Sequence, residues 1–312
     1  MKKKLLIIGS SGFFGKSIID FLEKKKIYDN FFSHIYLHYK SKKIKVSNKL
    51  KKKFNIILVK GDLSKIKKLP VSDYIIYTAL SNNLSKDRMA LKNYINLAKK
   101  FHKKSIIIYA SSGAVYGDQS NKLKGFKEDS SLDYEKQILN YKKEYAKTKY
   151  HNEKNLKKLN KFDIKVIIAR CFTFVGKNIP LDNKFVIGNI INNIIKKKTI
   201  KIKTKQVVIR SYMHTDDLSD IFLMLLIHQK KSFEIFNVGS DDPLDLHKLV
   251  QKLALVFKVN YKFNEIINQS TQDIYYPNIV KLRKKYKYNK KLDSLKSIIK
   301  TIKDFKKART KL

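Results

Sequence analysis

The chain has few cysteines and prolines and no long hydrophobic run. Its 312 residues include one cysteine, Cys171, and four prolines. A single cysteine excludes an intrachain disulfide framework and a multi-cysteine zinc site. The longest strongly apolar run, residues 221–227, is far shorter than the roughly 20 residues of a membrane span. The apolar start is broken at Gly9, too early for a secretory signal, so we expect a cytoplasmic protein.

Acidic residues are also scarce. Lys and Arg number 69 and Asp and Glu number 26, so the formal net charge is +43. The lysines are spread over nearly every segment. A nucleic-acid surface more often concentrates its charge and uses arginine, whose planar guanidinium fits phosphates and base edges. We therefore expect no specific nucleic-acid partner, and only a salt-sensitive attraction to polyanions.

Short apolar runs alternate with helical patterns through the first half of the chain. The predicted strands are 4–8, 33–38, 55–59, 73–79, 105–110 and 164–169. The predicted helices are 16–24, 85–101 and 141–159, and helical spacing returns in the lysine-rich tail, where we expect a surface helix. Strands that alternate with helices are typical of the α/β class with a doubly wound parallel sheet.

Three glycines follow the first predicted strand. Gly9, Gly12 and Gly15 form a G-x-x-G-x-x-G pattern that leads into the first predicted helix. Glycines at this place permit a tight turn and let backbone N–H groups approach a pyrophosphate, and the helix N-terminus adds a partial positive charge. The motif in this context predicts a dinucleotide site.

The ends of the second and third predicted strands bear on the choice of cofactor. In a dinucleotide-binding fold, an acidic residue after the second strand binds the ribose 2′-hydroxyl of NAD. Here that strand ends near His38 and Lys40 with no acid, so the cofactor is NAD or NADP, with NADP slightly favoured. Asp62, followed by Leu63, is placed to reach the adenine, although it could also be an ordinary turn aspartate.

A tyrosine, a lysine and a serine form the candidate catalytic group. Tyr145 and Lys149 are four residues apart on a predicted helix and so share one face. A nearby ammonium favours the phenolate form of a tyrosine, which can then exchange protons near neutral pH. Ser112 follows the fifth strand, at the sheet edge where ligands bind in open parallel sheets, and could hydrogen-bond a substrate alcohol or ketone.

Together these motifs resemble the extended short-chain dehydrogenase/reductases of the NAD-dependent epimerase/dehydratase family, over residues 4–281. The resemblance implies a Rossmann domain over 1–175, with returning segments at about 205–240, and a substrate-binding domain mainly over 176–312. It assigns Asn93 to support of the active site and Arg210 to the substrate diphosphate. It implies no metal, and a homodimer formed through the helices near 85–101 and 141–159.

The site residues that we expect follow from the motifs and the resemblance. The catalytic residues are Ser112, Tyr145 and Lys149. The expected cofactor contacts are Gly9, Gly12, Phe13, Phe14, Gly15, His38, Lys40, Asp62, Leu63, Thr78, Ala79, Asn93, Tyr145 and Lys149. The expected substrate contacts are Ser112, Thr173, Asn189 and Arg210, with Thr173 standing where many relatives carry asparagine.

The resemblance implies action on a nucleotide-linked sugar. Gly113 and Ala114 follow Ser112 where 4,6-dehydratases typically carry Asp-Glu, and neither can serve as the acid or base that water elimination needs. We therefore expect a nucleotide-sugar epimerase that transfers hydride at C4 through a keto intermediate, as in polysaccharide biosynthesis. An NADPH-dependent 4-ketoreductase is the alternative. A 4,6-dehydratase and a non-catalytic, NADP(H)-sensing protein are less favoured.

Overall fold

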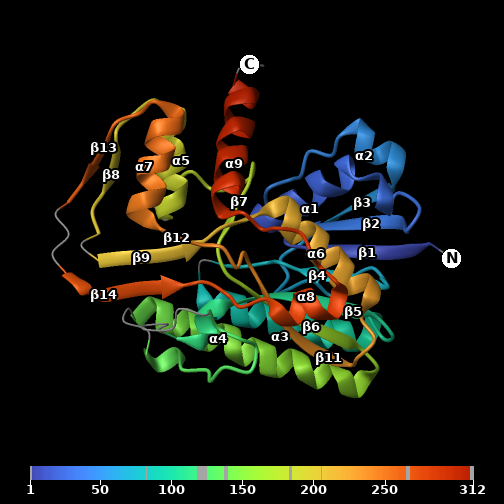
Figure 1. Ribbon diagram of the computed structural model, residues 1–312. Coiled ribbons are helices and arrows are strands. Elements are labelled where there is room, and N and C mark those ends of the chain that lie inside the picture. The colour runs from blue at the N-terminus through green and yellow to red at the C-terminus, as the bar shows by residue number, and fades with distance from the viewer. Residues whose placement is uncertain are drawn as a thin grey trace. The chain divides into compact units, whose positions relative to one another are not determined.

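The computed structural model describes residues 2–81, 83–117, 125–136, 140–182, 185–204, 206–264 and 268–309 (Figure 1). The chain divides into two compact units. Unit 1 comprises Met1–Val115, Leu139–Arg170 and Ser219–Phe236, and unit 2 comprises Tyr116–Ile138, Cys171–Leu218 and Asn237–Leu312. In these described ranges, no helix is both long enough and apolar enough to span a bilayer.

Unit 1 is built on a seven-stranded parallel sheet in the order β11-β6-β5-β4-β1-β2-β3. Its strands are β1 (Lys3–Ile8), β2 (Phe32–Tyr39), β3 (Asn55–Lys60), β4 (Tyr74–Tyr77), β5 (Ile106–Ser112), β6 (Lys165–Cys171) and β11 (Phe233–Val238). The order runs outward from β1 in both directions, as in a doubly wound sheet. The predicted α/β class and the predicted doubly wound parallel sheet are confirmed.

Helices lie on both faces of this sheet. They are α1 (Phe13–Lys24), α2 (Asn48–Lys53), α3 (Leu84–Phe101), α4 (Asn140–Lys157) and α6 (Thr215–His228). Figure 1 shows α3 and α4 packed together on one face, with α1 on the other. The hydroxyl of Tyr28, just after α1, donates to Asp220 on α6 at 3.1 Å, so α6 lies on the α1 side.

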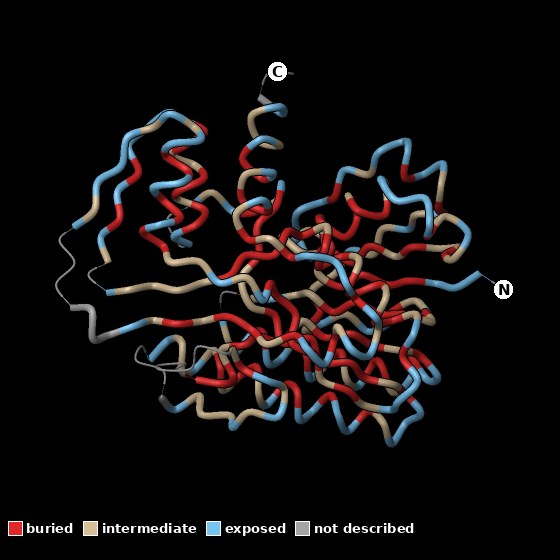
Figure 2. Tube along the Cα trace, in the orientation of Figure 1, coloured by how far each residue is buried: buried red, intermediate tan, exposed pale blue. Residues whose placement is uncertain are grey.

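The core of unit 1 follows the strands. The last four residues of β1, Leu5–Ile8, are completely buried, as expected for a parallel strand covered by helices on both faces. Figure 2 shows the same pattern, with buried residues running along the sheet. In this core, the ring of Tyr77 on β4 packs against Tyr94 of α3 and against Tyr109 of β5.

Unit 2 holds several small sheets and four helices within its described residues. Its elements are β7 (Phe174–Val175), α5 (Val186–Ile195), β8 (Ile200–Ile202), β9 (Gln206–Ser211), β10 (Met213–His214), β12 (Pro243–Asp245), α7 (Leu246–Phe257), β13 (Tyr261–Phe263), β14 (Asn268–Tyr275), α8 (Val280–Tyr286) and α9 (Ser294–Arg309). β9 is the centre of a three-stranded sheet between β12 and β14.

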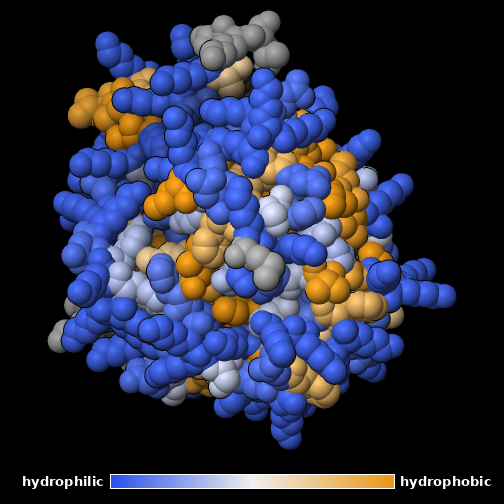
Figure 3. Space-filling view, turned by 90° about the vertical axis from the view of Figure 1, so that its right-hand side faces the viewer, coloured by the Kyte–Doolittle hydropathy of each residue, from blue (hydrophilic) through white to orange (hydrophobic). Residues whose placement is uncertain are grey.

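The predicted tail helix differs in one respect from the expectation of a surface helix. α9 buries Ile298 and Ile302 completely, so one of its faces belongs to the core of unit 2. The lysines of the same helix lie on its exposed side. Figure 3 shows that hydrophilic residues cover much of one face of the molecule, with hydrophobic residues gathered in patches between them.

Candidate active site

The glycine loop after β1 has a conformation that only glycine adopts readily. Gly9 has φ +84°, and a Cβ at this position would lie 2.5 Å from the backbone nitrogen of Ala79. A Cβ on Gly15 would collide with the carbonyl oxygen of Gly9 and with the Cα of Ser10. The first glycine therefore makes the turn, and the third lets α1 approach β1 closely.

The loop leads into the N-terminus of α1. Gly12 is the residue that precedes the helix, and no described side chain caps it. The first turn, which begins with Phe13 and Phe14, contains no acidic residue. The Ser10 hydroxyl donates to the carbonyl oxygen of His38 at 2.6 Å and fixes the loop against β2. A helix N-terminus without an acidic residue in its first turn can bind an anionic pyrophosphate.

The expected adenosine contacts Lys40 and Asp62 bind each other. The Lys40 ammonium lies 2.7 Å from Asp62 Oδ2, and Asp62 Oδ1 accepts hydrogen bonds from the backbone and the hydroxyl of Ser64. The hydrogen bonds from Lys40 and Ser64 hold the pKa of the Asp62 carboxyl well below its usual range. Lys40 thus already has an internal counter-ion, which a ribose 2′-phosphate would have to displace.

His38 lies near the end of β2, where the sequence places it. Its side chain is buried, and its two ring nitrogens have no hydrogen-bond partner within the part of the chain that the structure describes. Burial lowers the pKa of this imidazole, against smaller opposing effects of Gly61 and Asp62. The backbone carbonyl of His38, which holds Ser10, is the part of the residue that contacts the glycine loop.

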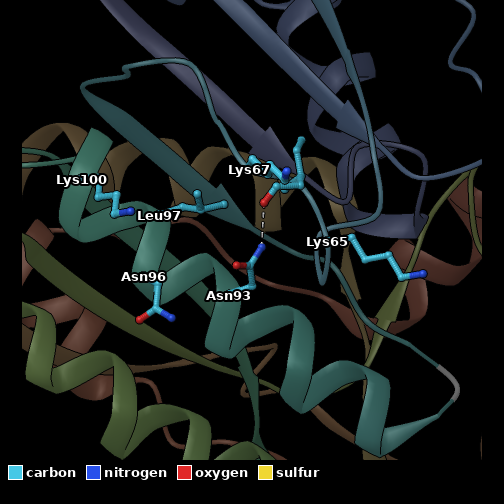
Figure 4. Close-up of a pocket in the computed structure, with 7 residues that line it drawn as sticks. Lys65, Lys67, Asn93, Asn96, Leu97 and Lys100 are labelled. Atoms are coloured by element: carbon cyan, nitrogen blue, oxygen red, sulfur yellow. Dashed lines mark hydrogen bonds between the residues drawn. The ribbon is translucent and has the colours of Figure 1, made fainter.

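Asn93 supports the loop that follows β3. Its amide nitrogen donates to the carbonyl oxygens of Leu63 and Ile66, both at 2.9 Å. Figure 4 shows this amide at the side of a pocket on α3 that is also lined by Lys65, Ile66, Lys67, Asn96, Leu97 and Lys100. The amide of Asn93 therefore orders the backbone around Leu63. Thr78 similarly ties the end of β4 to β1, because its hydroxyl donates to the Ile8 carbonyl oxygen at 3.0 Å.

Lys149 is buried between α4 and β5. Its Nζ donates to the hydroxyl of Tyr109 at 3.2 Å and to the carbonyl oxygen of Ala110 at 3.1 Å. The same Nζ lies 5.8 Å from the ring centre of Tyr145, one helical turn away. An ammonium has three N–H donors, and the described residues provide acceptors for two of those of Lys149. The third donor is available to a ligand. An ammonium near a tyrosine favours the phenolate form of that tyrosine.

Burial by itself lowers the pKa of Lys149, because it disfavours the charged amine. The effects of Tyr109, Tyr145 and Asp87 exceed that of burial and raise the pKa of Lys149 above its usual value. The side chain is therefore an ammonium throughout the physiological pH range. Asp87 itself, on α3, is buried, and burial raises the pKa of its carboxyl.

The two serines at the end of β5 have different partners. The hydroxyl of Ser111 donates to Glu153 Oε1 at 2.5 Å. Ser112 instead accepts a hydrogen bond from the backbone N–H of Ala114 at 3.2 Å, which starts the turn after the strand. Ser111 is thus bound to α4, and Ser112 is the serine of the pair that could serve a substrate.

Sequence reasoning did not single out Tyr109, Asn152 and Glu153. Asn152 and Glu153 lie seven and eight residues after Tyr145, so helical spacing could have placed them on the catalytic face of α4. The guanidinium of Arg170 is buried, and its Nη2 lies 2.8 Å from Glu153 Oε2. The charges of Glu153 and Arg170 therefore compensate each other inside unit 1.

Unit 2 contains the expected substrate residues other than Ser112, which lies in unit 1. Arg210 on β9 donates through Nη1 to the carbonyl oxygens of Ile209 and Asp273, and through Nη2 to Asp273 Oδ2 at 2.5 Å. Two of its five N–H donors have no partner among the described residues. Asn189 on α5 accepts a hydrogen bond from Asn193, and the backbone oxygen of Thr173 accepts one from Met213.

Comparison with solved structures finds chains of the same fold. A UDP-N-acetylglucosamine 4-epimerase from Methanobrevibacter ruminantium, in complex with UDP-N-acetylmuramic acid, is 18% identical with a TM-score of 0.76, over 99% of this chain and 100% of that one. A dTDP-glucose 4,6-dehydratase from Bacillus anthracis, in complex with NAD, is 14% identical with a TM-score of 0.76, over 99% and 98%. RMD from Pseudomonas aeruginosa, complexed with NADPH, is 17% identical with a TM-score of 0.75, over 98% and 100%.

No curated protein sequence matches the chain significantly. A protein family does match, over residues 5–239, which include the glycine loop and the Ser112, Tyr145 and Lys149 positions. Both the motifs and this match therefore lead to one conclusion: the chain belongs to the NAD dependent epimerase/dehydratase family.

Proposed function

We propose that this protein is a nucleotide-sugar epimerase that inverts the C4 centre of its substrate with a tightly held nicotinamide cofactor. The observation that carries the proposal is the buried Lys149 ammonium, which lies 5.8 Å from the Tyr145 ring and keeps one donor for a ligand. Membership of the family supports the same chemistry.

The cofactor contacts follow from the geometry of unit 1. The glycine loop and the N-terminus of α1 would hold the pyrophosphate, and the remaining N–H of Lys149 would hold the nicotinamide ribose. When bound, the nicotinamide supplies the site that accepts and returns hydride.

The proton chemistry belongs to Tyr145. Its phenolate oxygen would remove the proton of the sugar C4 hydroxyl as the C4 hydrogen leaves, and the phenol would return a proton when the ketone is reduced. The Lys149 ammonium stabilises the phenolate, and the Ser112 hydroxyl shares the hydrogen bond to the sugar oxygen. Inversion requires the C4 ketone to present its opposite face before the hydrogen returns.

The proposed substrate class rests on the Arg210 guanidinium of unit 2. Arg210 keeps two N–H donors beside Asp273, and a guanidinium can bind a phosphate through two parallel hydrogen bonds. We propose Arg210, with Asn189 and Thr173, as contacts of a nucleoside diphosphate sugar. A homodimer through α3 and α4 remains part of the proposal.

An NADPH-dependent 4-ketoreductase is the second candidate. It is favoured by the absence of an acidic residue at the end of β2, where Tyr39 and Lys40 stand. The Lys40–Asp62 ion pair acts against it, because a 2′-phosphate would have to compete with Asp62 for the Lys40 ammonium.

One isotope experiment tests the proposal and separates these candidates. UDP- and dTDP-hexoses carrying deuterium at C4 are incubated with the purified protein and followed by NMR. We expect a C4 epimer that retains its deuterium, because the hydrogen removed from C4 returns to C4. Deuterium recovered in free reduced cofactor together with a 4-keto sugar would instead establish the reductase reaction, run in reverse.

A further inference from the structure

Lys149 is held by a second tyrosine, on β5, that none of the family motifs used above includes. Tyr109 is almost fully buried, and its hydroxyl accepts hydrogen bonds from Lys149 Nζ at 3.2 Å and from Asn152 Nδ2 at 2.9 Å. The ammonium also lies 4.9 Å from the centre of the Tyr109 ring, within the range of a cation–π contact. Tyr109 thus contacts the Lys149 charge through both its oxygen and its ring.

We propose that Tyr109, oriented by Asn152, is a positioning residue that keeps the Lys149 side chain charged and aimed at the acid/base tyrosine. This inference rests on the proposed hydride-transfer function and adds two residues to that site. Tyr109 acts through Lys149, and we propose no contact between Tyr109 and the substrate.

The physical need for such a partner comes from burial. Lys149 is a nearly fully buried amine, and an isolated buried ammonium loses its proton readily. No carboxylate forms an ion pair with Lys149 among the described residues. The phenolic oxygen of Tyr109 and the carbonyl oxygen of Ala110 are the two acceptors that replace its water shell.

Asn152 determines from which direction the Tyr109 hydroxyl oxygen can accept a hydrogen bond from Lys149. Its amide nitrogen donates to that oxygen and occupies one acceptor direction, so the other remains for Lys149. Asn152 lies on α4, one turn after Lys149, and is itself buried. The helix that carries Lys149 therefore also fixes the partner of Lys149.

The other ionisable groups around Lys149 come from three further places. Tyr145 lies on α4, Asp87 lies on α3 and acts on Lys149 at longer range, and Tyr77 on β4 packs against Tyr109. Arg88, next to Asp87, donates to Thr148 and partly offsets the Asp87 charge. Glu153 is already paired with Arg170. Loss of the Tyr109 hydroxyl would leave Lys149 without its one side-chain acceptor.

The test compares Tyr109→Phe with Tyr94→Phe in the full chain. Tyr94 is a matched control because it lies in the same buried cluster, yet its hydroxyl finds no hydrogen-bond partner among the residues that the structure describes. The readouts are kcat and KM against pH for the sugar that the wild type turns over, together with binding of the nicotinamide cofactor.

We expect Tyr109→Phe to lower kcat at least tenfold, with little change in KM for the sugar. The basic limb of the rate profile should move down by about one pH unit, since a tenfold change in proton affinity is one unit. Tyr94→Phe should keep the wild-type profile. Asn152→Ser should shift the same limb in the same direction by less, and it preserves the test if Tyr109→Phe does not fold.

Two negative outcomes are distinguishable. If wild type and Tyr94→Phe are active and both Tyr109→Phe and Asn152→Ser keep the wild-type profile, the positioning role is overturned while the proposed function stands. If the wild type binds cofactor but exchanges hydride with none of the nucleotide sugars tested, the proposed function has failed. The role of Tyr109 then fails with it.

Discussion

Glu153 binds two groups that the sequence places far apart. Its carboxylate accepts from Ser111 on β5 and pairs with Arg170 on β6, and all three residues are buried. Breaking one side of a buried ion pair leaves a charge without compensation, which costs far more than the pair contributes when intact. The stability of α4 against the sheet therefore depends on this carboxylate.

We expect Glu153→Gln to lower the free energy of unfolding by about 3–5 kcal/mol, because the Arg170 guanidinium would remain buried opposite a neutral amide. Urea unfolding checks this value. Lys3→Met is the control, since Lys3 and Asp73 form an exposed pair 3.5 Å apart that is worth at most about 1 kcal/mol. Equal losses in the two variants would show that the buried pair has no special role.

Side-chain partners are the part of the site that sequence reasoning predicted least well. The glycine, serine, tyrosine and lysine positions follow from spacing along one strand or helix. The pairs Lys40–Asp62 and Lys149–Tyr109 join separate elements, and their formation depends on how those elements pack. Asn93 shows the same difficulty, because its partners lie on the loop after β3.

The turn from β1 to α1 depends on a single backbone conformation. Gly9 has φ +84°, and its Cα faces the backbone of Thr78 and Ala79 at the end of β4. A residue with a side chain at position 9 would have to adopt a left-handed backbone conformation, and its Cβ would push the end of β4 away from β1. The turn and the adjacent strand end are therefore coupled.

We expect Gly9→Ala to destabilise unit 1 by at least about 1–2 kcal/mol, the usual cost of a left-handed conformation in a non-glycine residue. It should also weaken cofactor binding, because the displaced loop no longer directs α1 at the pyrophosphate. Thermal unfolding and titration with NAD and NADP measure the two effects. Gly61→Ala is the control, because its Cβ would meet only the flexible end of Ile66. Wild-type behaviour of Gly9→Ala would contradict the account.

Regular elements of unit 1 could be predicted because their patterns are local. Each strand is a short apolar run between polar turns, and α3 carries its buried residues at helical spacing. The small strands of unit 2 have no such pattern. β7 and β10 are two residues long, and their existence depends on the chain around them.

The whole molecule combines a high positive charge with a largely apolar buried core. The net charge of +43 comes largely from lysines that lie on exposed faces, while the buried Lys149 has a defined set of partners. Charge and catalysis are therefore separate properties of this chain. The first governs attraction to polyanions, and the proposed catalysis depends on a few buried contacts in unit 1.

The central claim is that Tyr145 exchanges the proton during hydride transfer, and Tyr145→Phe tests it most directly. The variant is compared with Tyr141→Phe, an exposed tyrosine one turn earlier on α4. We expect Tyr145→Phe to lower kcat by about 10²–10⁴-fold, the usual contribution of a general acid–base group, with cofactor binding retained, and Tyr141→Phe to match the wild type. Turnover of a demonstrated substrate by Tyr145→Phe at the wild-type rate would contradict the account.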